Sequence, residues 1–285
     1  MKELNTLKYR FQNAGIVEKL IYINLCVFIA TFVFNTLGYL FQSNTNFLIQ
    51  WFSLSADLDS FLYKPWSIVS YGFLHGGFLH ILFNLIALYF IGNLFVQYFT
   101  SKQLLNFYLY GTIVGGILFL LSYNAFPVFK NLPHNNILVG ASAGISAIFV
   151  GIATYMPNYQ VKIPLIGYIK LWHLAAFWIL VDIIQIPVSN AGGHIAHLGG
   201  ALFGYLYVHN ASNKTLSFSN PLKNIFKKKE KPLKTVYKSG NKAFVKNSKS
   251  ENQEKIDAIL DKIGKSGYDA LTKAEKEFLF KQGKN

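Results

Sequence analysis

The chain has 285 residues, of which 52% are hydrophobic and only 14% are charged, and its mean hydropathy is +0.29. Soluble globular domains carry about 25% charged residues, so this composition argues against an ordinary soluble protein. The charge is also uneven, because residues 211–285 hold 18 lysines and 8 acidic residues, which is +10 of the formal net charge of +14. The chain therefore divides into an apolar body and a lysine-rich tail.

The lysine-rich tail suggests two kinds of partner. Nucleic acid attracts such segments, but a basic tail that follows a membrane body more often lies against anionic lipid headgroups on the cytoplasmic side. We therefore expect the lipid bilayer as a partner and no nucleic acid. At the other end, Met1–Lys19 is polar and lacks the apolar core and cleavage site of a signal peptide, so we expect the first apolar segment to be retained.

Six segments are long and apolar enough to cross a bilayer, which takes roughly 20 residues per helix. We expect these spans at Ile21–Phe41, Phe78–Phe99, Leu104–Tyr123, Ile137–Met156, Ile166–Ile186 and Gly193–His209. Lysine and arginine precede the first span, follow the sixth, and occur in the connections after the second and the fourth. By the positive-inside rule both termini are expected to be cytoplasmic. The predicted fold class is all-α: a polytopic membrane protein with a bundle of six transmembrane helices.

The predicted domains follow from these spans. Residues 1–20 form a cytoplasmic N-terminal segment, 21–210 the membrane domain, 211–250 a basic flexible linker, and 251–285 a small cytoplasmic helical hairpin. The long first loop, Gln42–Gly77, is too aromatic for a solvated linker, so we expect an interfacial or re-entrant element there.

The hairpin is predicted from periodicity and capping signals. One helical face is apolar, at spacings i, i+3, i+4 and i+7, through Ile256, Ile259, Leu260 and Ile263. Gly264 is the expected stop of this first helix, and the segment Thr272–Glu275 matches a capping box that would begin a second helix.

Polar side chains from three of the expected spans fall at one depth. With a cytoplasmic N-terminus, the second, fourth and sixth helices all run from outside to inside. His80 and Asn84 lie early in the second helix, Ser142 early in the fourth, and His197 early in the sixth. At about 1.5 Å per residue, each lies roughly 3–10 Å below the outer end of its helix. We therefore expect these groups to meet near the outer face.

Together these side chains contain the parts that acyl transfer needs. Ser142 is the candidate nucleophile and His197 the base that takes its proton. His80 and Asn84 lie one helical turn apart and are candidate donors to the developing oxyanion. Free backbone N–H groups at the start of the fourth helix add to these donors. Small-residue repeats, Gly140-x-x-x-Gly144 and Gly200-x-x-x-Gly204, would let the fourth and sixth helices approach closely.

These residues are also where the chain resembles the rhomboid intramembrane serine proteases. His80-Ile81-Leu82-Phe83-Asn84 is similar to the family's H-x-x-x-N element, Gly140-Ala141-Ser142 to its G-x-S element, and Ala196–Gly204 to its A-H-x-x-G-x-x-x-G element. Pro65-Trp66 and His75 also match, and the resemblance extends over about residues 40–209.

The resemblance implies a catalytic dyad of Ser142 and His197 with no third acid, and an oxyanion site lined by His80 and Asn84. It implies no cofactor, and substrates that are transmembrane proteins cut near the outer face. The tail beyond Ser250 is similar to a cytoplasmic extension of some bacterial rhomboids, so the expected location is the bacterial inner membrane. No oligomeric state is predicted.

Two positions depart from the family's pattern. The family often has arginine after the loop tryptophan, where this chain has Ser67 after Trp66. It also often has an aromatic ring four residues after the serine, stacked on the catalytic histidine, where this chain has Ser146.

Asp182, the one acid within the expected spans, is open to two interpretations. It lies at a depth from which it could orient His197 as in a triad, but a structural, solvent-facing role is expected instead. His194 is expected to belong to the rim or to a polar network. Trp172, Phe177 and Trp178 are expected to face lipid or to pack.

Two other functions compete with proteolysis. His75, His80, His194 and His197 suggest a metal site, but H-E-x-x-H is missing and no cysteine or acid is expected to join the histidines, so no metal is predicted. The second alternative is a non-catalytic membrane binding protein or transporter that uses the same polar pocket.

Overall fold

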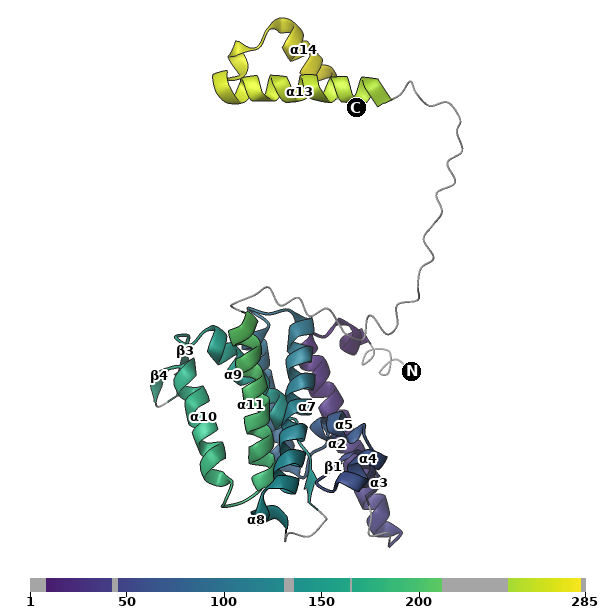
Figure 1. Cartoon of the computed structure of the whole chain (residues 1–285). Coiled ribbons are helices and arrows are strands. Elements are labelled where there is room, and N and C mark those ends of the chain that lie inside the picture. The colour runs from purple at the N-terminus through teal and green to yellow at the C-terminus, as the bar shows by residue number, and fades with distance from the viewer. Residues whose placement is uncertain (1–8, 43–45, 131–135, 165, 212–245, 283–285) are drawn as a thin grey trace. The chain divides into compact units, whose positions relative to one another are not determined.

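The computed structural model describes residues 9–42, 46–130, 136–164, 166–211 and 246–282. The chain divides into two compact units, Met1–Ser217 and Phe218–Asn285 (Figure 1). Most of the predicted linker, 211–250, lies outside the described residues.

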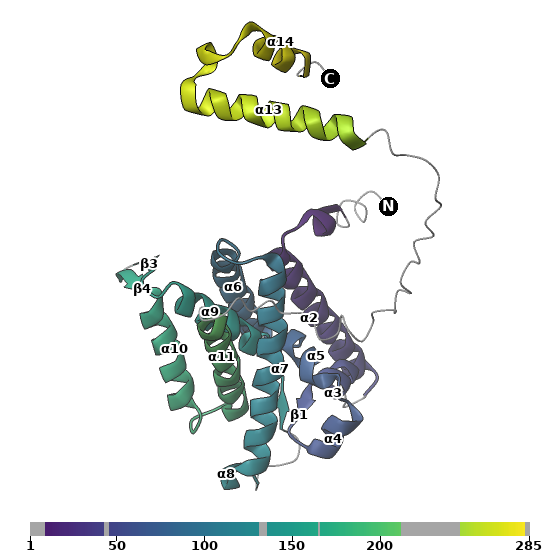
Figure 2. The ribbon, with the colours of Figure 1, turned by 45° about the horizontal axis from the view of Figure 1, so that its top comes forward.

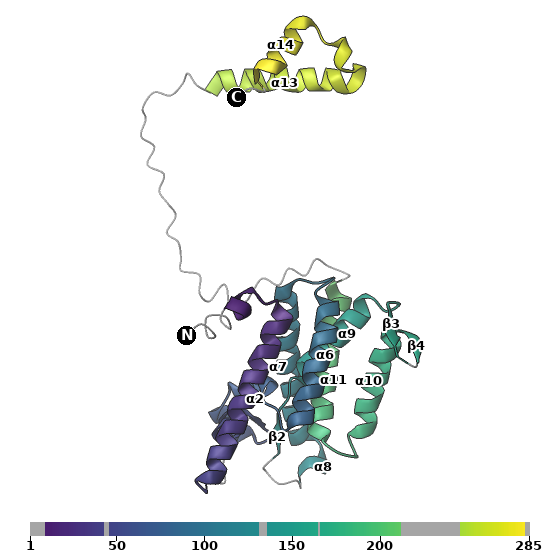
Figure 3. The ribbon, with the colours of Figure 1, turned by 180° about the vertical axis from the view of Figure 1, so that it is seen from behind.

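The first unit is a bundle of six apolar helices, as predicted. They are α2 (Ile16–Leu40), α6 (Phe78–Phe95), α7 (Ser101–Ala125), α9 (Ser142–Tyr155), α10 (Leu171–Gln185) and α11 (Ala191–Ala211). By length and composition α2, α6 and α7 can each cross a membrane, whereas α9 and α10 are shorter apolar helices. Two opposite views show that α6, α9 and α11 begin at the same end of the bundle, while α2, α7 and α10 run the other way (Figures 1 and 3).

The fourth helix begins later than predicted. Ile137–Leu138 forms a short strand, β2, that pairs antiparallel with β1 (Leu54–Ser55) from the first loop. Gly140 then adopts a φ of +134°, a conformation that side chains strongly disfavour, and it turns the chain into the helix. As a result Ser142 is the first residue of α9.

The fifth helix is shortened in the same way. The predicted start at Ile166 is wrong, because a β-hairpin of β3 (Gln160–Ile163) and β4 (Gly167–Lys170) occupies the preceding segment. The positive φ of Gly167 lies at the turn of this hairpin, and α10 follows directly from Leu171. Exposure alternates along β3, and no residue of either strand is buried, so the apolar residues here belong to a surface ribbon.

Helix α9 lies at the centre of the bundle and packs against α7, α6 and α11 (Figure 2). Every residue from Ala143 to Ala153 is buried. A side chain at Gly200 of α11 would overlap the carbonyl oxygen of Ala143, and one at Gly204 would overlap that of Ala147. The two backbones are therefore in direct contact along Gly200-x-x-x-Gly204, as this repeat predicted. The part predicted for Gly140-x-x-x-Gly144 is wrong, because Gly140 precedes α9 and a side chain at Gly144 would overlap the Tyr108 carbonyl oxygen of α7.

The first loop folds into short helices: α3 (Phe47–Phe52), α4 (Leu58–Tyr63), α5 (Ser67–Ser70) and the 3₁₀ turn η1 (Tyr71–Phe73). Trp66 Nε1 donates to the Trp51 carbonyl at 2.9 Å, and Lys64 Nζ donates to the Gln50 carbonyl at 2.8 Å. Lys64 also lies over the Trp51 ring. Ser67, where the family often has arginine, is buried. Lys64 and Trp66, which both precede Ser67, thus bond this part of the loop to the backbone of α3.

The second unit is a helical hairpin of α13 (Lys246–Ser266), the 3₁₀ turn η2 (Tyr268–Ala270) and α14 (Lys273–Gln282). The predicted capping box is present, since Thr272 Oγ1 accepts from the Glu275 N–H and the Glu275 carboxylate accepts from the Thr272 N–H at 2.7 Å. The predicted stop at Gly264 is wrong: α13 continues to Ser266, and Gly267, with a φ of +78°, ends it.

Candidate active site

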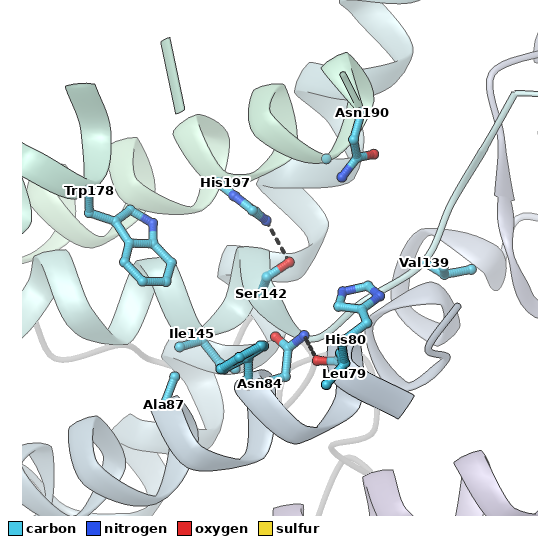
Figure 4. Close-up of a pocket in the computed structure, with 12 residues that line it drawn as sticks. Leu79, His80, Asn84, Ala87, Val139, Ser142, Ile145, Trp178, Asn190 and His197 are labelled. Carbon is cyan, nitrogen blue, oxygen red and sulfur yellow. Dashed lines mark hydrogen bonds between the residues drawn. The ribbon is translucent and has the colours of Figure 1, made fainter. Parts of the chain in front are cut away.

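A cavity of about 300 Å³ opens between α6, α9, α10 and α11 (Figure 4). Its lining contains all four predicted site residues, His80, Asn84, Ser142 and His197. The other lining residues are Leu79, Phe83, Ala87, Val139, Ile145, Trp178, Asn190 and Gly193. Apolar walls with a few convergent polar groups are typical of a ligand or substrate site.

The side chains of Ser142 and His197 meet in this cavity. Ser142 Oγ lies 2.7 Å from His197 Nε2, although the two residues are 55 positions apart in the chain (Figure 4). Ser142 is presented by the first turn of α9, and His197 comes from the second turn of α11. The contact predicted from helix depth is therefore present.

The N-terminus of α9 also supplies backbone donors. The first hydrogen bond within this helix runs from the Ile145 N–H to the Ala141 carbonyl. The N–H groups of Ser142, Ala143 and Gly144 therefore have no acceptor within their own helix. Such free N–H groups, together with the helix dipole, attract negative charge.

His80 and Asn84 face the same cavity from α6. The Gly76 N–H donates to His80 Nδ1 at 3.4 Å, which leaves Nε2 to carry the ring's proton. Asn84 Nδ2 donates one hydrogen to the His80 carbonyl at 2.8 Å and keeps its second hydrogen for another acceptor (Figure 4). The His80 ring and Ser142 Oγ both border the space that a side chain at Gly140 would fill. Two polar donors thus lie beside the serine.

His75 supports His80 from the loop before α6. It is buried, and its ring centroid lies 5.2 Å from that of His80 in an edge-on arrangement. Burial first, and then the neighbouring His80, lower the pKa of His75 to about 4. His75 is therefore uncharged near neutral pH and fixes the neighbouring ring by packing.

Asp182 is buried on α10, and the expectation that it faces solvent is wrong. Its Oδ1 lies 2.8 Å from His197 Nδ1 and 2.7 Å from His194 Nδ1. The short connection between α10 and α11 brings the first two turns of α11 back beside the end of α10. His194 belongs to a polar network, as expected. The expectation that no acid joins the histidines is also wrong, because Asp182, His194 and His197 form a cluster.

Trp178 packs against Phe149, in agreement with the expected packing role, and it also lines the cavity. Its Nε1 donates to Ser146 Oγ at 3.2 Å, and its ring centroid lies 6.4 Å from that of His197. An aromatic ring from α10 therefore approaches the histidine where the family often uses one from α9, and the small Ser146 accepts its hydrogen bond. Asn190 is a further lining residue that was not among the sequence candidates.

Comparison with known proteins gives a family match for the part of the chain that holds this cavity. Residues 63–213, slightly more than half of the chain, match the family model described as Rhomboid domain. Residues 245–283 match a model described as a family of unknown function, DUF6576. Among curated proteins the chain is similar to "RHOMBOID-like protein 12, mitochondrial" of Arabidopsis thaliana, with 29% identity over 169 residues that cover 55% of this chain and 49% of that protein. The chain thus spans about half the length of this relative. On the extent of the domain match and the helical membrane bundle, the chain belongs to the rhomboid family.

Proposed function

We propose that the protein is an intramembrane serine endopeptidase that cleaves transmembrane proteins near the outer membrane face. The observation that carries this proposal is the 2.7 Å contact between Ser142 Oγ and His197 Nε2 inside an apolar helix bundle. A serine hydroxyl is a weak nucleophile until a neighbouring base takes its proton, and histidine is the side chain best suited to do so near neutral pH. Membership of the rhomboid family supports the same activity.

The reaction proceeds in two halves. Ser142 Oγ attacks the scissile carbonyl carbon while His197 Nε2 accepts the hydroxyl proton. The carbonyl oxygen becomes an oxyanion, which accepts hydrogen bonds from His80 Nε2, from the free Asn84 amide hydrogen and from the start of α9. His197 returns the proton to the leaving amine, and an acyl-enzyme remains on Ser142. Water then attacks the ester, His197 again takes and returns a proton, and the carboxylic acid product leaves.

The length of α9 supports a position of this chemistry below the membrane surface. Its 14 residues span about 21 Å, which is shorter than the roughly 30 Å hydrocarbon layer of a bilayer. If the C-terminal end of α9 lies at the cytoplasmic boundary, Ser142 lies within the apolar layer, close to the outer side. This orientation rests on cytoplasmic termini, which the lysine distribution predicts. The bacterial inner membrane is the location that the resemblance of the tail implies.

The substrate class follows from the cavity walls. Leu79, Phe83 and Ile145 offer apolar surface beside Ser142, which suits the side chains of a transmembrane segment. A soluble peptide would have to enter the apolar layer before reaching the serine, whereas a transmembrane segment is already there. We therefore assign transmembrane proteins within the lipid bilayer as the partners, with no cofactor required.

A comparison of membrane fragments tests the proposed function. Membranes from cells that make the wild-type chain should contain new peptide ends in or next to transmembrane segments, and membranes with the Ser142→Ala variant should not. Mass spectrometry of peptide termini makes the measurement. Ser122→Ala is the matched control, because Ser122 is a buried serine of α7 outside the cavity, and its fragments should equal those of wild type. Identical fragments with and without Ser142 would favour a binding protein or transporter.

A further inference from the structure

Asp182 sits in the bundle as a buried carboxylate between two histidines. Only 6% of its side chain is exposed, and a single oxygen, Oδ1, lies within 2.8 Å of both His194 Nδ1 and His197 Nδ1. Its second oxygen, Oδ2, is buried without a hydrogen-bond partner among the described residues. Ionisable side chains at membrane depth are costly, and they are usually kept for function.

The carboxylate fixes which nitrogen of His197 carries the proton. An ionised carboxylate can only accept hydrogen bonds, so Nδ1 of each histidine must donate to it. A neutral His197 with its proton on Nδ1 has an unshared electron pair on Nε2, the atom that lies 2.7 Å from Ser142 Oγ. The other tautomer would carry a hydrogen on Nε2 and could not accept the serine proton.

We propose that Asp182 is a positioning residue that turns the pair of Ser142 and His197 into a triad. It holds His197 in the proton-accepting tautomer and stabilises the imidazolium that forms when the serine proton is transferred. This inference rests on the proposed Ser142 and His197 chemistry. It departs from the dyad without a third acid that the resemblance to rhomboids implies.

His194 anchors the carboxylate from the other side. It lies one helical turn before His197 on α11, and its Nδ1 donates to the same oxygen at 2.7 Å. His194 makes no contact with Ser142 in the described structure, and it does not line the cavity. Its role is to hold the Asp182 carboxylate in place rather than to move a proton.

The distances from Asp182 to His194 and His197 favour direct hydrogen bonds over a metal ion bound between the three side chains. The nitrogen-to-oxygen separations of 2.7 and 2.8 Å match hydrogen bonds between charged and polar groups. Donors around a tetrahedral zinc ion with bonds of about 2.0–2.1 Å lie about 3.4 Å apart, so this cluster would have to open to hold one.

Steady-state kinetics of the full-length chain in proteoliposomes test this inference, using a cleaved transmembrane segment as substrate. Asp182→Asn should lower kcat at least about 100-fold, because triads that lose their aspartate in this way lose about 10⁴-fold. KM should change less than about threefold, because the carboxylate does not touch the substrate. Asp182→Glu should recover at least about tenfold of the lost kcat, since it restores an acceptor. His194→Ala should lower kcat less than about tenfold, because the hydrogen bonds from Asp182 to His197 and from His197 to Ser142 both remain.

The outcomes separate this inference from the proposed function. If Ser142→Ala still cleaves, the proposed function itself is wrong. If Ser142→Ala is inactive but Asp182→Asn keeps more than about 1% of kcat, only the role of Asp182 is overturned. Loss of wild-type activity on addition of a chelator would likewise overturn it in favour of a metal. Nitrogen-15 NMR of the wild-type chain with labelled histidine avoids any dependence on whether a variant folds. Neutral His197 should show the Nδ1–H tautomer, and the Nε2–H tautomer would contradict the inference.

Discussion

Replacing Ser142 with alanine should lower the rate of peptide-bond cleavage by about 10⁶-fold, and replacing His197 with alanine should cost nearly as much. The reason is that neither group acts alone: the hydroxyl needs a base within hydrogen-bonding distance, and the base needs a nucleophile to deprotonate. At 2.7 Å the two atoms already form that unit. Single-turnover cleavage of a transmembrane substrate in proteoliposomes measures the loss.

The double variant makes this prediction sharper. Because the two side chains work as one unit, Ser142→Ala with His197→Ala should be no slower than either single variant. Ser122→Ala, the control on α7, should cleave like wild type. Losses that multiply in the double variant would mean that the two residues act separately, and the proposed proton transfer between them would be wrong.

Replacing Asn84 with alanine should lower kcat by about 10² to 10³-fold while changing KM little. Its free amide hydrogen has its strongest acceptor only when the carbonyl oxygen becomes an oxyanion, so the interaction stabilises the transition state more than the bound substrate. Steady-state kinetics that separate kcat from KM make the measurement.

Asn93 provides a matched control on the same helix. Its Nδ2 donates to the Tyr89 carbonyl at 2.8 Å, which repeats the bond from Asn84 to the His80 carbonyl. Asn93 does not line the cavity around Ser142. Asn93→Ala therefore makes the same local change without removing an oxyanion donor, and it should keep kcat within about threefold of wild type. An equal loss in both variants would show that Asn84 serves the helix rather than the reaction.

The six-helix bundle could be predicted because length and hydrophobicity alone decide which segments cross a bilayer. The starts of α9 and α10 could not, and α2 also begins at Ile16 instead of the predicted Ile21. Ile137–Leu138 and the residues around Ile166 are apolar, and short apolar runs fit a strand as well as a helix. In both places glycines with positive φ, Gly140 and Gly167, mark where the strand segment turns.

The contact between Ser142 and His197 could be predicted because depth in a membrane follows from position along a helix. The orientation of α10 about its own axis could not be predicted. Apart from Asp182, its inward side chains are no more apolar than exposed ones such as Phe177 and Ile183, so the sequence carries no clear amphipathic pattern. Asp182 and Trp178 lie four residues apart and so share one face of α10. Placing Asp182 inward would have placed Trp178 in the cavity as well.

The central claim is that His197 makes Ser142 Oγ nucleophilic inside the bundle, and covalent labelling tests it most directly. The purified full-length chain is treated with a fluorophosphonate probe, and peptide mass spectrometry locates the adduct. We expect the adduct on Ser142 of wild type and of Ser122→Ala, none on Ser142→Ala, and very slow labelling of His197→Ala. A folded wild-type chain that forms no adduct on Ser142, or a His197→Ala variant that is labelled as fast as wild type, would contradict the account.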